Sequence, residues 1–169
     1  MTTRPPITPW NPSRRATAKV TNPLPIPESC RYCASVVRVV TNDQIYNGRQ
    51  YGEWPWVCLC DNAECGAYVG FHPFTGIPLG TLARRPLRDA RKQAKALFNP
   101  FWESGRMTRG EAYASLAKAM GIPELECHFG WFDEAQCQQA IDHLSNPPHC
   151  PQNMNRAPLW TGARKRSAQ

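Results

Sequence analysis

The feature that most constrains this chain is the spacing of its first five cysteines. Cys30 and Cys33 are separated by two residues, and a second group, Cys58, Cys60 and Cys65, begins after a further twenty-four residues. A two-residue loop between cysteines places two sulfur atoms on one metal ion with little strain, and structural zinc sites take four such ligands. The spacing therefore predicts one structural Zn²⁺ in a zinc-ribbon β module.

The spacing leaves one ligand open. Cys30, Cys33 and Cys65 belong to the expected set, but the remaining ligand is either Cys58 or Cys60. These two cysteines share the same side of a strand, so the alternation of side chains does not separate them. The spare cysteine is expected to be a small buried apolar residue. A thiol redox site at Cys30 and Cys33 lacks the surrounding βαβ pattern that would support it.

The sequence before residue 84 is typical of short strands joined by turns. Residues 35–41 contain four valines and residues 67–71 form a second apolar run, so each segment predicts a strand. Between them, Asn47-Gly48 is a turn signal that predicts a short hairpin. We therefore expect residues 30–83 to form the β module.

From Pro86 onward the apolar residues recur at helical spacing. A first helix is expected to follow Pro86 and to end near Pro100. A second helix opens at Thr108 with a capping-box sequence and stops at Gly121. A third follows Asp133, whose side chain can cap it. The sequence thus predicts about three helices after the ribbon.

The two ends of the chain differ in composition from the middle. Seven of the seventeen prolines lie in the first 27 residues, and the ends carry net charges of +3 and +4, whereas the middle has twelve basic and twelve acidic residues. Segments rich in proline and charge bury too little apolar surface to fold, so both ends are expected to be disordered. The predicted organisation is α+β: a basic arm (1–29), the zinc ribbon (30–83), a helical region packed with it as one domain (84–144) and a basic tail (145–169).

Two observations indicate where such a chain resides. It has no run of eighteen apolar residues, and its N-terminal segment contains arginine and proline where a signal peptide needs an apolar stretch. Paired cysteines in a reducing compartment are typical of metal binding rather than of disulfides. We therefore expect a cytoplasmic protein that neither spans a membrane nor is secreted.

The first predicted helix carries a basic stripe at helical spacing. Its members are Arg84, Arg85, Arg88, Arg91, Lys92 and Lys95. A single acidic residue, Asp89, lies among them, so the cations repel one another without local compensation. The six residues are candidate nucleic-acid-binding residues, and the alternative is a solvated outer helix face.

Several motifs resemble one known family. They are Cys30-Arg31-Tyr32-Cys33, Trp56-Val57-Cys58, Glu64-Cys65-Gly66-Ala67-Tyr68-Val69-Gly70, His72, Pro78-Leu79-Gly80-Thr81-Leu82-Ala83, Phe98-Asn99-Pro100-Phe101-Trp102, Arg109-Gly110-Glu111-Ala112-Tyr113 and Cys127-His128-Phe129-Gly130-Trp131-Phe132-Asp133. Over residues 30–143 the chain resembles zinc-finger-containing proteins found largely in bacteriophage and prophage genomes.

This resemblance implies a location in the cytoplasm of a bacterial host cell, but it carries no activity with it. It favours Cys58 over Cys60 as the open ligand, because the ligand-like cysteine of the family follows the Trp-Val pair. The ribbon is also similar to the four-cysteine modules at the C-terminal ends of bacterial type I topoisomerases, which bind single-stranded DNA.

Other metal-ligating residues lie outside the ribbon. Cys127, His128 and Cys137 are candidate ligands of a second metal site, and His143, His149 and Cys150 follow them in the sequence. Apart from directly adjacent residues, however, no two of them have the short spacing that is typical of zinc ligands, and Cys137 falls in an apolar helical stripe. His72 follows the last ribbon cysteine by seven residues and is expected to be exposed or hydrogen-bonded rather than a ligand.

The function expected from the sequence is non-enzymatic, because no histidine-based metal site or acid–histidine pair accompanies the cysteines. We expect a nucleic-acid-binding protein, with single-stranded DNA favoured, that uses the basic helix, exposed ribbon aromatics and basic tails. The alternative is a protein-interaction module that binds and redirects a host protein, with zinc serving the fold alone. Neither hypothesis includes a small-molecule substrate.

Overall fold

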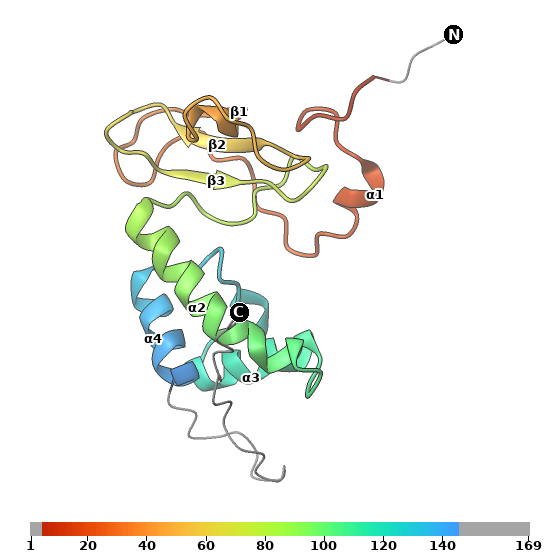
Figure 1. The fold of residues 1–169 in the computed structure, drawn as a ribbon, viewed down its shortest axis with the longest axis vertical. Helices are drawn as coiled ribbons and strands as arrows, with labels where there is room; N and C mark the ends of the chain where they lie inside the picture. The colour runs from red at the N-terminus through yellow and green to blue at the C-terminus, as the bar shows by residue number, and fades with distance from the viewer. Residues whose placement is uncertain (1–4, 146–169) are drawn as a thin grey trace, which may run out of the picture.

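The computed structural model describes residues 5–145, and within them a small sheet lies above a group of helices (Figure 1). The strands are β1 (Val37–Thr41), β2 (Trp56–Cys60) and β3 (Tyr68–Gly70), and the longer helices are α2 (Arg85–Glu103), α3 (Arg109–Met120) and α4 (Glu134–Ser145). A short helix α1 (Arg14–Thr17) and two 3-10 turns, η1 (Asn42–Gln44) and η2 (Glu124–Glu126), complete the described elements. The predicted α+β class is confirmed. None of the described helices is long and apolar enough to cross a membrane.

The three strands form an antiparallel sheet in the order β1-β2-β3. Val39 pairs with Cys58, and Cys58 pairs with Val69, so Cys58 lies in the middle strand at the centre of the sheet. The short hairpin expected around Asn47-Gly48 is absent from the described structure, because β2 pairs with β1 across the long 42–55 connection. The turn propensity of Asn47-Gly48 is overridden by a side chain that hydrogen-bonds to the backbone of this connection.

This hydrogen-bonding residue is Asn42, whose side chain is buried. Its amide nitrogen donates to the Tyr51 carbonyl oxygen at 2.8 Å, and its amide oxygen accepts from the Tyr51 backbone N–H at 3.1 Å. The asparagine thus bonds the backbone of the connection as a neighbouring strand would. Residues 45–55 consequently run as a loop, with Tyr46 and Tyr51 exposed on it.

The helical region has its own apolar core. Helix α2 buries Leu87, Ala94 and Phe98, and it packs alongside α4, which buries Cys137 and Ala140 (Figure 1). Apolar residues three and four apart line one face of each helix, which is why these faces meet. The helix α2 runs through Pro100, where the sequence predicted its end, and stops at Glu103.

The starts of α3 and α4 follow from reciprocal caps. At α3 the Thr108 side chain accepts from the Glu111 backbone N–H, while the Glu111 carboxylate accepts from the Thr108 N–H. At α4 the Asp133 carboxylate accepts from the Gln136 N–H at 2.8 Å, and the Gln136 side chain accepts from the Asp133 N–H at 3.0 Å. Each cap satisfies backbone donors that a helix start leaves unpaired, so both predicted starts are confirmed.

The expectation of disorder over residues 1–29 is wrong for residues 5–29, which include contacts with the ribbon, while residues 1–4 lie outside the described residues. The Trp10 ring meets the Trp56 ring edge-on at 5.3 Å, and the Ser13 N–H donates to the Phe74 carbonyl oxygen at 2.9 Å. Gly76 lies so close to the arm that a Cβ there would overlap the Pro9 carbonyl oxygen. An extended proline-rich segment needs no internal hydrogen bonds, so it can pack on an existing surface. The tail beyond Ser145 lies outside the described residues.

The ribbon and the helical region meet at two glycines. The Thr81 N–H donates to the Gly130 carbonyl oxygen at 2.9 Å, and a Cβ on Gly80 would overlap that same oxygen. The two backbones approach this closely because neither Gly80 nor Gly130 carries a side chain. The segment after β3 is therefore fixed against the turn that precedes α4.

Candidate metal centre

Four cysteine sulfur atoms converge at one end of the sheet. The Sγ atoms of Cys30, Cys33, Cys60 and Cys65 all lie within 4.8 Å of one another. The Cys30 and Cys65 sulfurs are 3.6 Å apart, and the Cys33 and Cys60 sulfurs are 3.4 Å apart. A tetrahedral zinc with Zn–S bonds of about 2.3 Å separates its sulfurs by roughly 3.8 Å. The cluster therefore has the donor set and the dimensions for one structural Zn²⁺.

Two tight turns position the cysteine sulfur atoms. In the first, the Cys30 N–H donates to the Ser35 carbonyl oxygen and the Ala34 N–H donates to the Cys30 carbonyl oxygen, each at 2.8 Å. In the second, the Cys65 N–H donates to the Asn62 carbonyl oxygen, and the Asn62 side chain accepts from the Glu64 N–H, each at 3.0 Å. An asparagine that bonds the backbone two residues on fixes such a turn. The turns place Cys30 and Cys65 side by side.

The structure corrects the third ligand from Cys58 to Cys60, the alternative that the spacing had left open. Both side chains lie on the same face of β2, but two residues along a strand span about 7 Å, so only one can reach the cluster. Cys60 is the last residue of β2, next to the turn that carries Cys65. Cys58 is fully buried at the centre of the sheet, and burial raises the pKa of both the Cys58 and the Cys60 thiol to about 12, so position rather than acidity separates the two. The preference for Cys58 rested on family resemblance, which does not encode where the strand ends.

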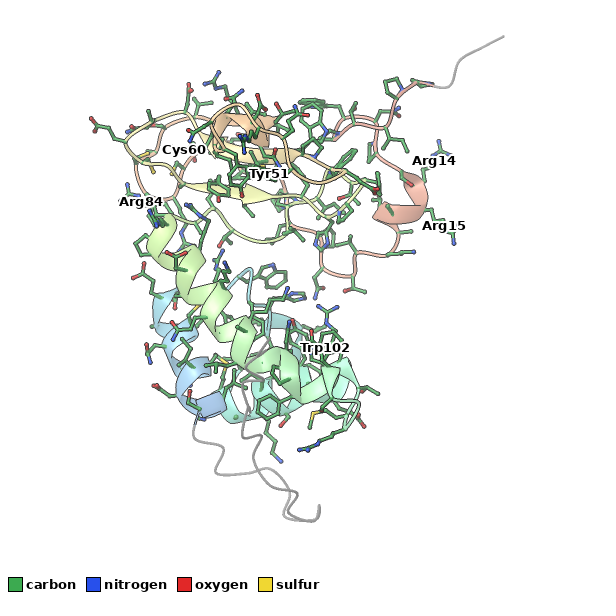
Figure 2. The ribbon with its side chains drawn as sticks, viewed as in Figure 1. Arg14, Arg15, Tyr51, Cys60, Arg84 and Trp102 are labelled. Carbon is green, nitrogen blue, oxygen red and sulfur yellow. The ribbon has the colours of Figure 1, made fainter. Side chains whose placement is uncertain are left out.

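Arg84 faces the cluster from the start of α2. Its Nε lies 3.4 Å from the Cys65 sulfur, and its guanidinium lies over the Tyr32 ring, 4.8 Å from the centroid. Figure 2 shows Arg84 and Cys60 at the same end of the sheet. Burial raises the pKa of Cys65, but hydrogen bonds from Arg84, the Ala67 backbone and Cys30 together outweigh burial, and the pKa of Cys65 is lowered. Four thiolates around one Zn²⁺ leave a net charge of about −2, so a cation here stabilises the loaded site.

Ser35 acts similarly on the exposed side of the cluster. Its hydroxyl lies 3.5 Å from the Cys33 sulfur, and this hydroxyl and the Ser35 backbone together lower the pKa of that thiol to about 6. A thiol must lose its proton before it can bind zinc. Cys33 is therefore already prepared for metal at neutral pH.

The basic stripe of α2 does not form one free surface. Arg88 donates to the Ala83 and Gly66 carbonyl oxygens at 2.6 and 3.2 Å. Arg91 donates to the Phe132 and Thr81 carbonyl oxygens at 2.8 and 2.9 Å. Together with Arg84, these cations thus connect α2 to the ribbon and to the turn before α4. The regular spacing indicated a shared helix face, but it gave no sign that this face packs on the protein.

The other three cations of the stripe lie in solvent. Arg85 forms an ion pair with Asp89 at 3.7 Å, while the side chains of Lys92 and Lys95 are exposed. The six candidate nucleic-acid-binding residues therefore fall into two groups of three cations with different surroundings.

The residues considered for a second metal site do not assemble one. Within residues 5–145, the four ribbon cysteines are the only group of three or more ligands close enough to share an ion. Cys127 and Cys137 are buried in the helical core, and burial raises the pKa of each thiol to about 11. His72 is half-buried near His128 rather than in the cysteine cluster. His149 and Cys150 lie outside the described residues.

Comparison with known families agrees with this centre. A family described as a zinc-finger-containing domain matches residues 26–147. The chain belongs to this family. The match includes the helical region as well as the ribbon, so in this zinc-finger-containing domain the metal cluster and helices α2, α3 and α4 form part of one family unit. The chain matches no curated protein and no solved structure.

Proposed function

We propose that this zinc-finger-containing protein binds single-stranded nucleic acid, without catalysis, on the sheet face that points away from the metal. The observation that carries the proposal is a group of three tyrosines beside a fixed arginine. We call this group the outer sheet surface, and its members are Tyr46, Tyr51, Tyr68 and Arg88.

The sheet register places Tyr68 on this face. Arg38 pairs with Leu59 and Leu59 pairs with Tyr68, so the three form one cross-strand row. Cys58 and Cys60 occupy alternate positions of β2 and therefore lie on the opposite face. Tyr68 therefore lies on the face opposite the metal, where Val57 is buried and Leu59 and Tyr68 are half-buried.

The exposed tyrosines of the 42–55 connection adjoin this row. The rings of Tyr46 and Tyr51 meet edge-on at 5.0 Å, and 41% and 55% of the two residues are exposed (Tyr51 is labelled in Figure 2). Burial raises the pKa of Tyr68, and the neighbouring Tyr46 side chain raises it further. Exposed aromatic rings stack on nucleic-acid bases with about 1–3 kcal/mol per base.

Arg88 adds a positive charge in a fixed place. Its guanidinium lies 3.9 Å from the centroid of the Tyr68 ring and is held by two carbonyl oxygens rather than by a carboxylate. The described residues form two ion pairs, Arg38–Asp61 and Arg85–Asp89, and neither includes Arg88. A cation that keeps its charge and loses little side-chain freedom is well suited to a phosphate.

The absence of catalysis in this proposal rests on the cysteine ligands. Zinc sites with four cysteine ligands leave no open position for water or substrate, which catalytic zinc sites require. The resemblance of residues 30–143 to phage and prophage proteins supports a role in the cytoplasm of a bacterial host. The similarity of the ribbon to topoisomerase four-cysteine modules supports single-stranded DNA as the ligand.

The test is binding of a fluorescent single-stranded oligonucleotide to the zinc-loaded full chain, followed by anisotropy at low salt. We expect the double substitution Tyr46→Ala with Tyr51→Ala to weaken binding about ten-fold or more, because two stacking rings are lost. Leu125→Ala is the matched control, since Leu125 is 71% exposed on η2, away from the sheet.

Equal affinity of the double variant and the parent would contradict this placement of the site. No binding to single-stranded DNA or RNA would contradict the function itself. In that case the zinc ribbon would be better explained by the protein-interaction hypothesis, which capture of one host protein from nuclease-treated lysate would support.

A further inference from the structure

A second feature lies on the other side of the molecule from the metal, where three segments meet. A cavity of about 460 Å³ opens between the N-terminal arm, the loop after β3 and the helical region. The arm contributes Lys19, the loop contributes His72 and Phe74, and the helical region contributes Arg109, His128 and Trp131. Small-molecule sites typically have volumes of about 300–1,000 Å³ and occur where separate parts of a fold meet.

The charged and titratable groups that line the cavity are all basic. Lys19, Arg109, His72 and His128 line it, and no carboxylate is among its lining residues in the described chain. The nearest acid on α3, Glu111, is occupied by the capping box with Thr108. Glu124 and Glu126 of η2 are exposed and lie outside the lining. The positive charges of Lys19 and Arg109 are not compensated by any lining acid, so the cavity has a local positive potential.

The aromatic side chains of the cavity are fixed in place. Trp131 stacks on His128, with ring centroids 4.9 Å apart and planes at 29°. Phe74 has φ of +61°, an uncommon backbone conformation for a bulky residue. The Phe74 conformation is held because its carbonyl oxygen accepts from Ser13 on the arm and the buried Thr75 bonds back to His72. Strained residues of this kind concentrate at ligand sites.

The surroundings of the two histidines lower the pKa of both side chains. Burial lowers the pKa of His72, and His128 lowers it further. Burial also lowers the pKa of His128, with a further contribution from Arg109. At neutral pH both imidazoles are therefore mainly uncharged, and Lys19 and Arg109 supply the permanent charge. A bound anion would favour protonation of both rings.

We propose that this cavity binds a phosphomonoester attached to an aromatic group, which is the chemistry of a nucleotide. Arg109 and Lys19 contact the phosphate, His72 and His128 donate hydrogen bonds to its oxygens, and Trp131 and Phe74 pack against the base. The ligand is either a free nucleotide or the 5′-phosphorylated end of a strand, which share this chemistry. The cavity is separate from the outer sheet surface, so this proposal does not depend on nucleic-acid binding at that surface.

The test is calorimetric titration of the zinc-loaded full chain with adenosine monophosphate, with adenosine, and with a short DNA strand that carries or lacks a 5′-phosphate. We expect at least one phosphorylated probe to bind about ten-fold more tightly than its unphosphorylated counterpart, since only the phosphate oxygens accept charge-assisted hydrogen bonds from the basic side chains. Tight binding of the monophosphate identifies a nucleotide site. Tight binding of the phosphorylated strand alone identifies a strand-end site.

Two matched pairs of variants locate the binding. Arg109→Ala and His128→Gln should each weaken it, whereas Lys118→Ala on the same helix and His143→Gln on α4 should leave it unchanged. Arg109 also lies over the Trp102 and Tyr113 rings, so Lys19→Ala, at an exposed arm position, provides a variant with little effect on the core. Equal binding of phosphorylated and unphosphorylated probes, or loss of binding in the controls alone, would overturn the proposal.

Titration with inorganic sulfate tests the histidines separately, because the charge of sulfate does not change between pH 5 and 8. Histidines with lowered pKa values gain their protons only as the pH falls below the usual range, so sulfate should bind several-fold more tightly at about pH 5 than at about pH 8. The double substitution His72→Gln with His128→Gln should remove that dependence. Sulfate affinity that does not change with pH would overturn the role given to the histidines.

Discussion

At the scale of single residues, the metal centre depends on groups that do not bind the metal. Arg84 lies 3.4 Å from the Cys65 sulfur and over the Tyr32 ring, so its charge is directed at the thiolates. Ser35 lowers the pKa of Cys33 from the other side. The four sulfurs carry more negative charge than one Zn²⁺ neutralises, so these neighbours stabilise the bound state.

The role of Arg84 is tested by Arg84→Ala. We expect the zinc affinity to fall by about ten-fold or more, as is usual when a group that bonds a metal ligand is removed. Competition with a chromophoric chelator measures it. Arg85→Ala is the control, because the adjacent Arg85 pairs with Asp89 in solvent and should leave the affinity unchanged. Equal affinities for the two variants would contradict the contact with Cys65.

At the scale of elements, the contact between ribbon and helices depends on a close backbone approach. Thr81 donates to the Gly130 carbonyl oxygen, and in α2 Arg88 donates to Ala83 while Arg91 donates to both Thr81 and Phe132. Gly80 is the position at which any side chain would separate the two parts.

Gly80→Ala is therefore expected to destabilise the fold by roughly 1–3 kcal/mol, the usual cost of inserting a methyl group into a filled space. Gly110→Ala is the matched control. Gly110 lies in α3 with open space around its Cα, so alanine there should be neutral or stabilise the helix by up to about 1 kcal/mol. Urea unfolding of both variants measures the difference, and a Gly80 variant as stable as the parent would show that the two backbones are not in contact.

Elements whose local signals agree with their distant contacts were predicted correctly, whereas the turn signal at Asn47-Gly48 and the stop signal at Pro100 are overridden in the fold. The capping boxes at Thr108 and Asp133 lie within four residues of the helices they start, so the sequence alone located α3 and α4. The valines of β1 did the same for that strand. The 42–55 connection depends on Asn42 bonding Tyr51, nine residues away, and no local propensity reports such a bond.

The residues of the metal site were likewise predicted only where the signal is local. The spacing of the cysteines correctly predicted Cys30, Cys33 and Cys65 as ligands, because a turn that carries metal-binding cysteines is a local structure. The choice of Cys60 depends on where β2 ends, and pairing with β1 and β3 determines that end. The direction of Arg84 and the histidine cavity depend on how whole segments pack, so the sequence did not indicate them.

At the scale of the whole molecule, the arm joins the ribbon to the helical region. Pro9, Trp10 and Ser13 contact the ribbon, and the Asn22 side chain donates to the Leu125 carbonyl oxygen at 3.4 Å. A segment with the composition of a disordered tail is therefore part of the packed structure. Its order comes from the surface it covers rather than from its own apolar content.

Removal of residues 1–21 should consequently lower the melting temperature by several degrees, since a loss of 1 kcal/mol shifts a domain of this size by about 2–8 °C. Gly76→Ala tests the same contact in the full chain, because the added methyl overlaps the Pro9 carbonyl oxygen. Gly70→Ala is the control, with only ordinary contact to Leu79. An unchanged melting temperature for both the truncation and Gly76→Ala would mean that the arm does not pack in solution.

The sulfur atoms of Cys30, Cys33, Cys60 and Cys65 form a site for one structural zinc. Native mass spectrometry of protein purified without chelator tests it most directly, with Cys60→Ala and Cys58→Ala as a matched pair. We predict one zinc per chain in the parent and in Cys58→Ala, and little or no zinc in Cys60→Ala, because three thiolates hold the ion less tightly than four. A parent without zinc, or zinc lost from Cys58→Ala and kept by Cys60→Ala, would contradict the account.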